Sequence, residues 1–534
     1  MRGLPILLCV CLSSGWGWCM AQDWSTSQIL GTQGVTQCQG LSFCSDAGYV
    51  LAGAFSSSLT LNDNTFTTNG EDDLVLARFD EAGELLWAKH YGSVLDDRFA
   101  KIIVLENDHT LGVGIFWVTI ELGPFELNTT QSPKAIFIAE WDEMGTVLWA
   151  KAITGTGLLD INDLGVDAEE NLHLAGYFGE SLQYDGLGLT ANGQTDLFVL
   201  KLTATGAPIW ASHAGQSRDA RAVGLSVLDD QRVFVSGFYN DTLVVANDTL
   251  TAFSFDDDTF LAEFSPTGVP LGAKKLGGVF DDQVVALVRD AEGAVYQVGY
   301  LTGVIGITED WSIESTSIRP NTYVIKFSSD GVPLWAKTFG DAALFQATAA
   351  ELTGDQLLIT GVYEQTHTIG NTTISATNGT TDGFFMSLQL NGELELVHSI
   401  PGTGQTRPSQ VTLGTAGNLL VGGGFEQSLL VPFERTAAGD FDIFILGKQD
   451  AILPTEEPAT LPNEVVFPNP NDGLLHLPKS CISWYVKVFN DLGQLLLEAS
   501  ASEQLDLQGL SAGRYHVQLQ GCNQSISQTL IVVN

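Results

Sequence analysis

The feature that most limits the fold is an internal repeat with a period of about 62 residues. Segments such as DEAGELLWAK and SSDGVPLWAK contain a first series of glycines at Gly83, Gly145, Gly206, Gly268, Gly331 and Gly392. A second series occupies apolar-x-Gly-x-aromatic segments at Gly53, Gly114, Gly176, Gly237, Gly299, Gly361 and Gly423. A third set of short apolar runs begins at Asp73, Ala135, Asp196, Asp258, Asn321, Asp382 and Asp442. Three series with one period predict a chain built from copies of one structural unit.

Each period holds about four or five short runs of β-favouring residues separated by Gly and Asn/Asp turns, without a sustained helical period. A lone sheet of this size would expose both faces and two edges, and a ring of such sheets, a β-propeller, supplies the missing neighbours. Residues 22–450 hold about seven periods, so we predict an all-β fold with a seven-bladed β-propeller. The array starts late, around Ile29, and finishes with the lone strand 442–448. One blade is therefore expected to combine both ends of the array and close the ring.

The repeat unit resembles the SBBP-type β-propeller repeat of bacterial exported proteins. The resemblance covers roughly residues 29–448 and rests on the D-x-F, D-x-x-G-x-x-L-W-A-K and G-x-F segments in that order. Blades four and six depart from the pattern, because Gly272 and Leu396 stand where other blades carry Trp87, Trp149, Trp210 and Trp335.

The first 21 residues have the layout of a secretory signal peptide. Arg2 precedes an apolar stretch from Leu4 to Leu12, and small residues lead to an expected cleavage after Ala21. Four cysteines then remain, and an even number in an exported chain predicts disulfides. Proximity in the sequence favours the pairs Cys38–Cys44 and Cys481–Cys522.

The charge of the chain limits its partners. It has 63 acidic and 23 basic residues, a formal charge of −40, yet 44% of its residues are hydrophobic, so it can bury a core. Such an acidic surface repels phosphate backbones, and we expect no nucleic-acid partner. After the signal segment, no apolar run approaches the roughly 18–20 residues of a membrane-spanning helix, so no transmembrane segment is expected.

The last part of the chain predicts a separate small domain. AILPTEEPATLP (451–462) indicates a linker, and residues 463–534 contain short alternating strands that fit a small Ig-like β-sandwich. This segment resembles the type A C-terminal sorting domain of the type IX secretion system. The matching landmarks are 468–470 with Gly473, 488–493 and 510–515. The resemblance implies the type IX secretion machinery as a partner of residues 463–534, and delivery to the cell surface or the medium.

Two recurring residue types favour a structural role. The four tryptophans recur where a propeller needs bulky side chains between its sheets, which is a simpler interpretation than sugar stacking. The aspartates that open the third strand series are typical turn caps whose carboxylates accept backbone N–H groups. Ala135 replaces one of them, as a cap allows.

A better candidate for binding is the loop that ends in Asp97, Asp160, Asp219 or Asp282 in four successive blades. In a ring these carboxylates would gather at one mouth of the channel and attract Ca²⁺ or a cationic ligand. The pattern breaks in later blades, where Asp341 is offset and Arg407 appears. Inert turn chemistry is the alternative interpretation, and the sequence indicates no cofactor.

The function predicted from these features is an exported, non-enzymatic binding or adhesion module whose extracellular ligand, a glycan or a protein, is unknown. The sequence has no HExxH, G-x-S-x-G, P-loop or Rossmann motif. One alternative is a secreted hydrolase or lyase that uses acidic residues at the channel mouth. Another alternative is a structural component of a surface layer.

Overall fold

The computed structural model describes residues 26–31, 36–62, 64–129, 132, 134–253, 256–315, 317–341, 343–377, 380–414, 417–431 and 435–448, and after these six strands between 474 and 532. The predicted signal peptide (1–21) and linker (451–462) lie outside the described residues. The chain divides into two compact units, Met1–Ile452 and Leu453–Asn534.

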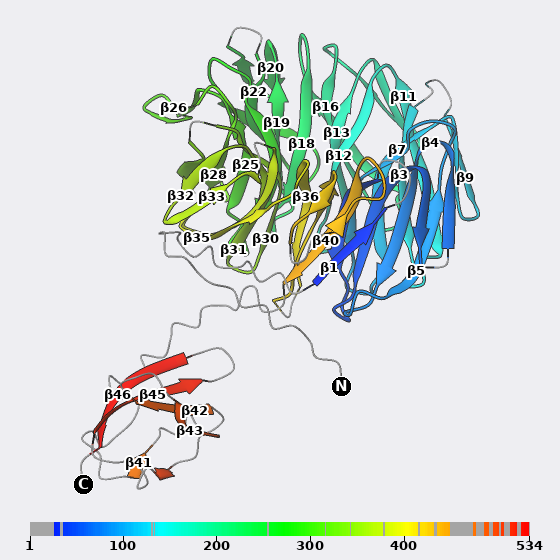
Figure 1. Ribbon diagram of the computed structural model, residues 1–534. Helices are drawn as coiled ribbons and strands as arrows, with labels where there is room; N and C mark the ends of the chain where they lie inside the picture. Colours follow the sequence, from blue (N-terminus) through cyan, green and yellow to red (C-terminus); the bar gives the residue numbers. More distant parts are fainter. Residues whose placement is uncertain are drawn as a thin grey trace. The chain divides into compact units, whose positions relative to one another are not determined.

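The first unit is built on groups of four antiparallel strands that follow one another along the chain and are numbered here as sheets from first to seventh (Figure 1). The second sheet gains two further strands from a hairpin of the third. The first to fourth are β2 (Thr36–Phe43), β3 (Tyr49–Leu61), β4 (Asn64–Phe79), β5 (Leu85–Tyr91); β6 (Arg98–Val104), β7 (Thr110–Trp117), β10 (Lys134–Trp141), β11 (Val147–Thr156); β12 (Leu159–Val166), β13 (Leu172–Phe178), β16 (Asp196–Leu202), β17 (Pro208–Ala214); and β18 (Ala220–Val227), β19 (Val233–Tyr239), β22 (Asp258–Phe264), β23 (Pro270–Leu276). The fifth to seventh are β24 (Gln283–Arg289), β25 (Val295–Leu301), β28 (Asn321–Phe327), β29 (Pro333–Phe339); β30 (Phe345–Thr353), β31 (Gln356–Tyr363), β34 (Asp382–Gln389), β35 (Leu394–Ile400); and β36 (Thr406–Leu413), β37 (Leu419–Phe425), β40 (Asp442–Lys448), β1 (Thr26–Leu30). The fifth and sixth are joined by one parallel pair, Asn321 and Phe345.

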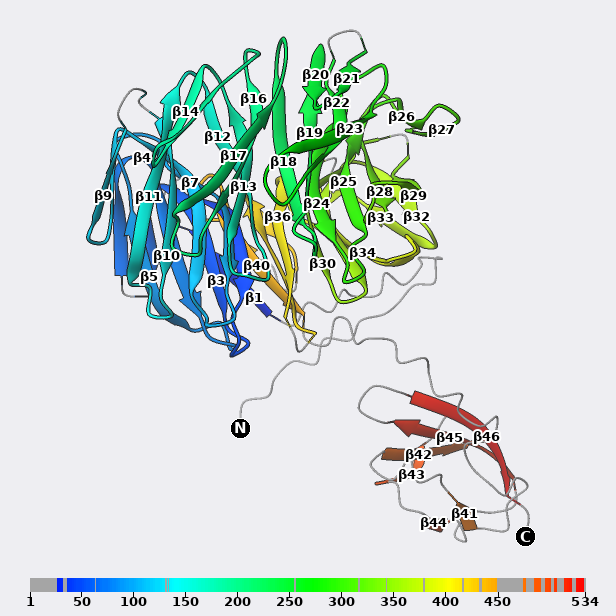
Figure 2. The same ribbon diagram turned by 180° about the vertical axis from the view of Figure 1, so that it is seen from behind.

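Short hairpins connect the second and third strands of most sheets, and some project at the margin of the unit (Figure 2). They are β8 (Thr119–Leu122) with β9 (Phe125–Asn128), β14 (Ser181–Tyr184) with β15 (Leu187–Thr190), β20 (Thr242–Val245) with β21 (Asp248–Thr251), β26 (Val304–Thr308) with β27 (Trp311–Glu314), β32 (Thr366–Ile369) with β33 (Thr372–Ser375), and β38 (Ser428–Leu429) with β39 (Arg435–Thr436). In the first sheet, the long strands β3 and β4 themselves form the equivalent extension.

The hydrophobic core is divided into clusters, each of which lies between two neighbouring sheets. Apolar side chains on both faces of each sheet are buried, and each fully buried Leu or Val contributes roughly 1.5–3 kcal/mol. One further cluster joins the first sheet to the seventh, because Leu51 and Phe55 pack with Leu420 and Ile443. Each sheet therefore depends on its neighbours for half of its core.

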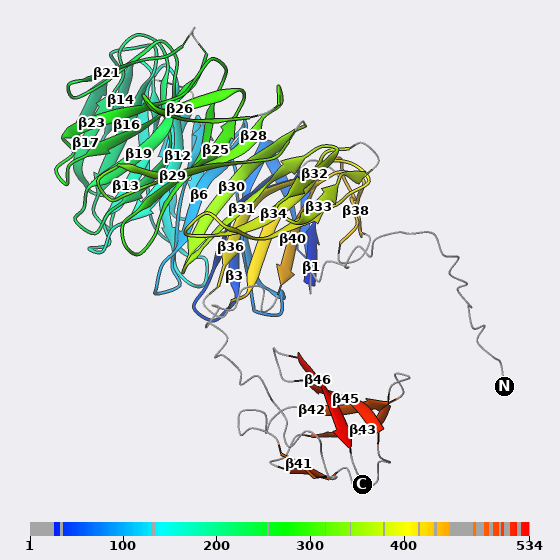
Figure 3. The same ribbon diagram turned by 90° about the vertical axis from the view of Figure 1, so that its left-hand side faces the viewer.

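The two ends of the array meet in the seventh sheet, as the repeat offset predicted. Strand β1 pairs antiparallel with β40, and Figures 1 and 3 show the two side by side. The Ser409 hydroxyl donates to the carbonyl of Cys38 at 2.8 Å, which ties β36 to β2. No single sheet closes on itself, so the closed seven-bladed ring stays a prediction that these contacts support.

Hydrogen bonds confirm that the aspartates that open the third strand series are turn caps. Asp73 accepts a hydrogen bond from the Asn69 N–H at 2.7 Å, and Asp196 accepts from Gly193 at 2.9 Å. The same arrangement holds at Asp258, Asp382 and Asp442. Each of these carboxylates is buried and stabilises the turn that precedes its strand.

The tryptophans confirm their interpretation as packing residues. Trp87 of β5 donates to the carbonyl of Glu143 in the second sheet at 2.9 Å, and Trp210 and Trp335 make the same bond to turns of the following sheets. A Cβ added at Gly145 would lie 2.9 Å from the Trp87 ring. The glycine of each turn, whose φ is +75° at Gly145, therefore leaves room for the tryptophan of the preceding sheet.

The predicted disulfide between Cys38 and Cys44 is wrong, because both residues are buried free thiols. Cys38 packs between the first and seventh sheets, whereas Cys44 packs between the first and second. Strand β2 separates them by six extended residues, roughly 20 Å, while a disulfide requires Cα atoms within about 7 Å. Cys481 and Cys522 lie outside the described residues.

Both buried thiols are expected to resist alkylation. Burial raises the pKa of Cys38 and of Cys44 to about 12, so almost no thiolate forms at pH 8. Iodoacetamide should leave both unmodified in the folded protein and modify both in denaturant without a reductant, as measured by peptide mass. A dependence on reductant would contradict the free thiols, and the same digest tests the predicted Cys481–Cys522 bond.

The second unit is also built of strands. Its four-stranded sheet has the order β43 (Leu495–Ser500), β42 (Tyr485–Asn490), β45 (Gly513–Gln520), β46 (Ser525–Val532), and β41 (Leu474–His476) pairs with β44 (Gln504–Asp506). The strands agree with the predicted all-β domain, and their packing as a β-sandwich stays a prediction. Within the parts of the chain that the structure describes, no helix is long and apolar enough to cross a membrane.

Candidate functional site

The first strands of the sheets share one register, which places one residue of each at the same point. A β-bulge interrupts every first strand at the same position, for example between Cys38 and Gly40 and between Phe99 and Lys101. Two residues before each unpaired bulge residue lies a polar side chain, and together these form what we call the mouth ring: Gln37, Arg98, Asp160, Arg221, Gln283, Gln346 and Arg407. The ring is thus mixed in charge, with three arginines and one aspartate.

The four predicted aspartates do not share one position in this register. Asp97 and Asp282 precede the ring residues Arg98 and Gln283, Asp160 is itself in the ring, and Asp219 lies two residues before Arg221. Asp97, Asp219 and Asp282 lie before the first residue of their strands, whereas Asp160 lies within β12, so the four carboxylates are not at equivalent positions. Nowhere among the described residues do three or more His, Cys, Asp or Glu side chains gather to hold a metal ion. The expectation of one acidic mouth is therefore wrong in geometry.

Asp97 and Asp282 are closed off from solvent, each with 0% exposure. Burial, reinforced by the nearby Asp258, raises the pKa of Asp282 to about 8. The N–H groups of Thr302 and Gly278 face this carboxylate and oppose the rise, although neither reaches ordinary hydrogen-bond geometry. Burial likewise raises the pKa of Asp97 to about 7, against hydrogen bonds from Ser93. Both carboxyls hold a proton more readily than a surface aspartate.

The other two aspartates are held in ion pairs at the mouth ring. Asp160 binds the guanidinium of Arg98 and lies 3.0 Å from the Lys134 ammonium. Asp219 lies 3.2 Å from the Arg221 guanidinium. These pairs cancel much of the negative field that a row of aspartates would create.

Partly buried aromatic rings stand beside the mouth ring in three successive sheets. Tyr177, Phe238 and Tyr300 pair across the strands with Asp160, Arg221 and Gln283, and we call them the aromatic row. The Arg221 guanidinium lies 4.6 Å from the centre of the Tyr177 ring and 5.8 Å from that of Phe238. The remaining sheets carry smaller residues at this position, namely Ala54, Ile115, Val362 and Gly424.

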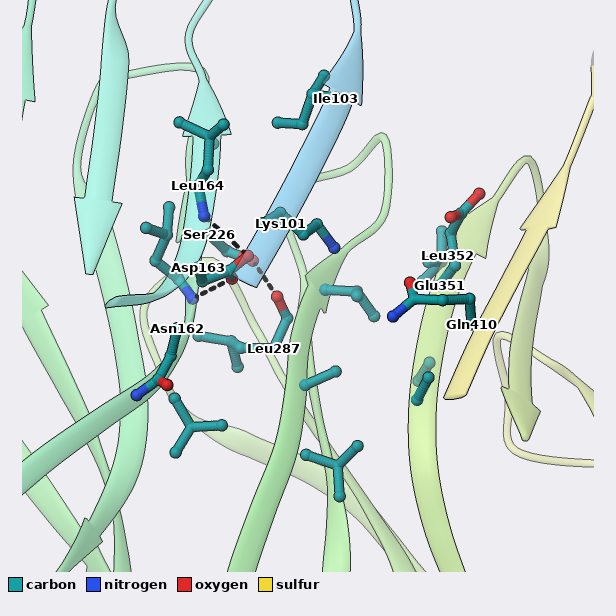
Figure 4. A pocket seen from close by; sticks show the side chains of 18 of the residues that line it. Lys101, Ile103, Asn162, Asp163, Leu164, Ser226, Leu287, Glu351, Leu352 and Gln410 are labelled. Carbon is teal, nitrogen blue, oxygen red and sulfur yellow. Dashed lines mark hydrogen bonds between the residues drawn. The ribbon is translucent and has the colours of Figure 1, made fainter. Parts of the chain in front are cut away.

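Beyond the bulges, the first strands of all the sheets line one central cavity of about 460 Å³. The other sheets carry small residues at the position of Lys101, Asp163 and Gln410, namely Gly40, Gly224, Ala286 and Ala349, and the two glycines let the neighbouring first strand approach closely. Figure 4 shows Lys101 reaching from β6 between Asp163 on one side and Glu351 and Gln410 on the other. The cavity is therefore a polar chamber with two cationic groups in its wall, the Lys101 ammonium and the Arg289 guanidinium, and the latter is paired with Asp229 at 2.8 Å.

The carboxylates of the cavity are anchored to the protein, but the ammonium group is not. Asp163 accepts from the N–H groups of Leu225 at 2.8 Å and Leu164 at 3.0 Å. Glu351 accepts from the Thr412 hydroxyl at 3.0 Å. Within the described residues, Lys101 makes no hydrogen bond or ion pair, although its charge opposes the rise in pKa that burial causes at both carboxyls. The Lys101 amine is available to a ligand.

Two amides of the cavity are held in a defined orientation. Asn162 donates through Nδ2 to the carbonyl of Ala222 at 2.6 Å, and Gln410 donates through Nε2 to the carbonyl of Gln39 at 3.2 Å. Their side-chain oxygens remain as acceptors. The sequence analysis missed this chamber, because its residues share a layer only after one bulge residue is skipped in each first strand. The period-62 alignment of Lys101 with Asp163 was the available signal.

Residues 465–533 match the family described as the secretion system C-terminal sorting domain. This segment is therefore a sorting domain, and it directs the chain through type IX secretion to the cell surface or the medium.

A curated relative is the "Uncharacterized WD repeat-containing protein L264" of Acanthamoeba polyphaga mimivirus, 23% identical over 351 residues. The match covers 52% of this chain and 25% of that protein, so this chain spans about a quarter of the relative's length. The relative is also named as a repeat protein.

Several solved structures are similar at low sequence identity. Pyrococcus horikoshii acylaminoacyl peptidase has a TM-score of 0.39 at 9% identity, covering 75% of this chain and 52% of that chain. YCF48 bound to D1 peptide has a TM-score of 0.36 at 8% identity, covering 80% and 96%. PorZ, a surface component of the type IX secretion system of Porphyromonas gingivalis, has a TM-score of 0.17 at 10% identity, covering 95% and 100%. These likenesses are too distant to carry an inference about activity.

Proposed function

We propose that this exported chain is a binding module that attaches to a glycan outside the cell through its mouth ring and aromatic row. The observation that carries the proposal is the aromatic row itself, three rings that are only partly buried at one register position of consecutive sheets. Aromatic rings offer large apolar faces on which the C–H face of a sugar can stack. The neighbouring carboxylate, amide and guanidinium groups supply donors and acceptors for its hydroxyls.

The proposal contains no catalytic step. Asp97 and Asp282 are the mouth-loop carboxyls with a pKa near neutrality, as an acid catalyst needs, but neither is exposed. A glycan seated on the aromatic row would not reach their oxygens. Asp160 and Asp219 are engaged with arginines, which disfavours their use as free bases. These placements support binding over hydrolysis.

Replacing Tyr300 by alanine is expected to weaken glycan binding about tenfold, because one stacking face is worth roughly 1.4 kcal/mol. A glycan array with the full secreted chain would identify the ligand, and calorimetry would measure the affinity. Val362→Ala is the matched control, since Val362 occupies the same register position in the sixth sheet. Equal loss in both variants, or binding only to proteins, would contradict the proposal.

A further inference from the structure

The central cavity offers a second site that is separate from the aromatic row. All the first strands contribute to its wall, and its volume of about 460 Å³ falls in the range of small-molecule pockets. Polar residues of every first strand line it, and the groups that matter most for the charge balance are Lys101 on β6, Asp163 on β12 and Glu351 on β30. A ligand inside would therefore be surrounded on several sides.

The charged groups of the cavity indicate which charges a ligand must carry. We propose that the central cavity binds a small zwitterion, an amino acid or another compact ammonium carboxylate, whose carboxylate meets Lys101 and whose ammonium meets Glu351 or Asp163. Among the described residues Lys101 interacts with Asp163 and Glu351 only through their charges, so an anionic group can contact its ammonium without breaking a hydrogen bond or ion pair. The acceptors opposite it are the carboxylates of Glu351 and Asp163 and the amide oxygens of Asn162 and Gln410.

Ligands with a single charge suit this chamber less well. A simple anion would approach two carboxylates in a chain whose formal charge is −40, and the second cation of the wall, Arg289, is already paired with Asp229. A simple cation would leave the Lys101 ammonium unpaired in a confined space, which is costly. A neutral sugar would leave both signs of charge unpaired. Only a molecule that carries both charges satisfies both sides at once, and its zero net charge avoids long-range repulsion.

The geometry also explains how the ligand would be oriented. Asp163 is fixed by the two N–H groups of Leu164 and Leu225, and Glu351 is fixed by the hydroxyls of Thr412 and Thr353. These bonds hold the acceptors in place before a ligand arrives, so little side-chain freedom is lost on binding. Lys101 supplies the adjustable contact, because its long side chain can follow carboxylates at different distances.

The test uses matched probes on the full secreted chain: γ-aminobutyrate and glycine as zwitterions, and butyrate and n-butylamine as analogues with one charge. Calorimetry is expected to show that at least one zwitterion binds ten or more times more tightly than both single-charge analogues. Lys101→Met should abolish the preference for the zwitterion over n-butylamine. Glu351→Gln should reduce the preference for the zwitterion over butyrate. Lys101→Arg, which keeps the charge, should retain binding if Lys101→Met fails to fold.

Lys89→Met is the control, because Lys89 lies on the outer strand β5 and does not line the cavity. No binding of either zwitterion, or equal binding of all four probes, would overturn the inference. Binding that Lys101→Met and Glu351→Gln leave unchanged would overturn it as well. Glycan binding and its loss in Tyr300→Ala would be unaffected by these outcomes, so the two proposals fail separately.

Discussion

Replacing Gly31 by alanine is expected to detach β1 from the seventh sheet and to destabilise the propeller unit by about 3 kcal/mol. An added Cβ at Gly31 would lie 2.1 Å from the carboxyl carbon of Asp442. Asp442 is buried and accepts a hydrogen bond from Ala438 at 2.6 Å, so it cannot move aside without leaving polar groups unpaired. The contact joins the two ends of the array.

Chemical unfolding followed by circular dichroism would measure the change in stability, and limited proteolysis would show whether the segment around Thr26 becomes accessible. Gly306→Ala is the matched control, because the nearest atom to its added Cβ is 3.6 Å away. We expect this control to stay within about 1 kcal/mol of the wild type. Equal stability of the Gly31 and Gly306 variants would contradict a closing role for Gly31.

Asp282→Asn is expected to stabilise the protein by several kcal/mol at pH 8.5 and to have little effect near pH 4. The folded protein keeps a proton on Asp282 up to a pKa of about 8, whereas the ordinary aspartate value is 3.8. At a pH between these two pKa values, unfolding therefore releases a proton from Asp282. The free energy of unfolding decreases as the pH rises through this range. Asparagine mimics the protonated carboxyl at every pH, so it removes this loss.

The measurement is the difference in unfolding free energy between wild type and variant at intervals from pH 4 to pH 9. Asp97→Asn should also stabilise the protein increasingly as the pH rises, but over a narrower pH range, because the pKa of Asp97 is about 7. Asp310→Asn, at an exposed turn, is the control and should show no such trend. A difference that shrinks as the pH rises would refute the proposed protonation of Asp282.

The repeat period predicted much of the fold because one period fixes both the turns and the packing residues. Asp73 and its equivalents are caps and Trp87 packs on the next sheet, as expected, since turn and wedge residues must recur in every sheet. The pairing of β1 with the final strand followed from counting strands alone. Such features depend on local chemistry repeated at a constant spacing.

The candidate site was predicted less well because side-chain direction depends on single-residue register. Asp97 and Asp160 occupy similar loops, but one precedes the mouth ring and the other belongs to it. A shift of one residue changes the surroundings of a side chain, so Asp97 is closed off from solvent whereas Asp160 meets Arg98. The predicted Cys38–Cys44 disulfide was wrong for a related reason. Two residues close in the sequence lie far apart in space when an extended strand runs between them.

The pairing of β1 with β40 has a consequence for the order of assembly. Thr26 of β1 pairs with Gly447 of β40, a residue 421 positions further along the chain. A chain made from its N-terminus onward must therefore leave β1 unpaired until nearly the whole propeller unit exists. Contacts this distant in sequence slow folding, and every truncated product would carry an open strand edge that can recruit another chain.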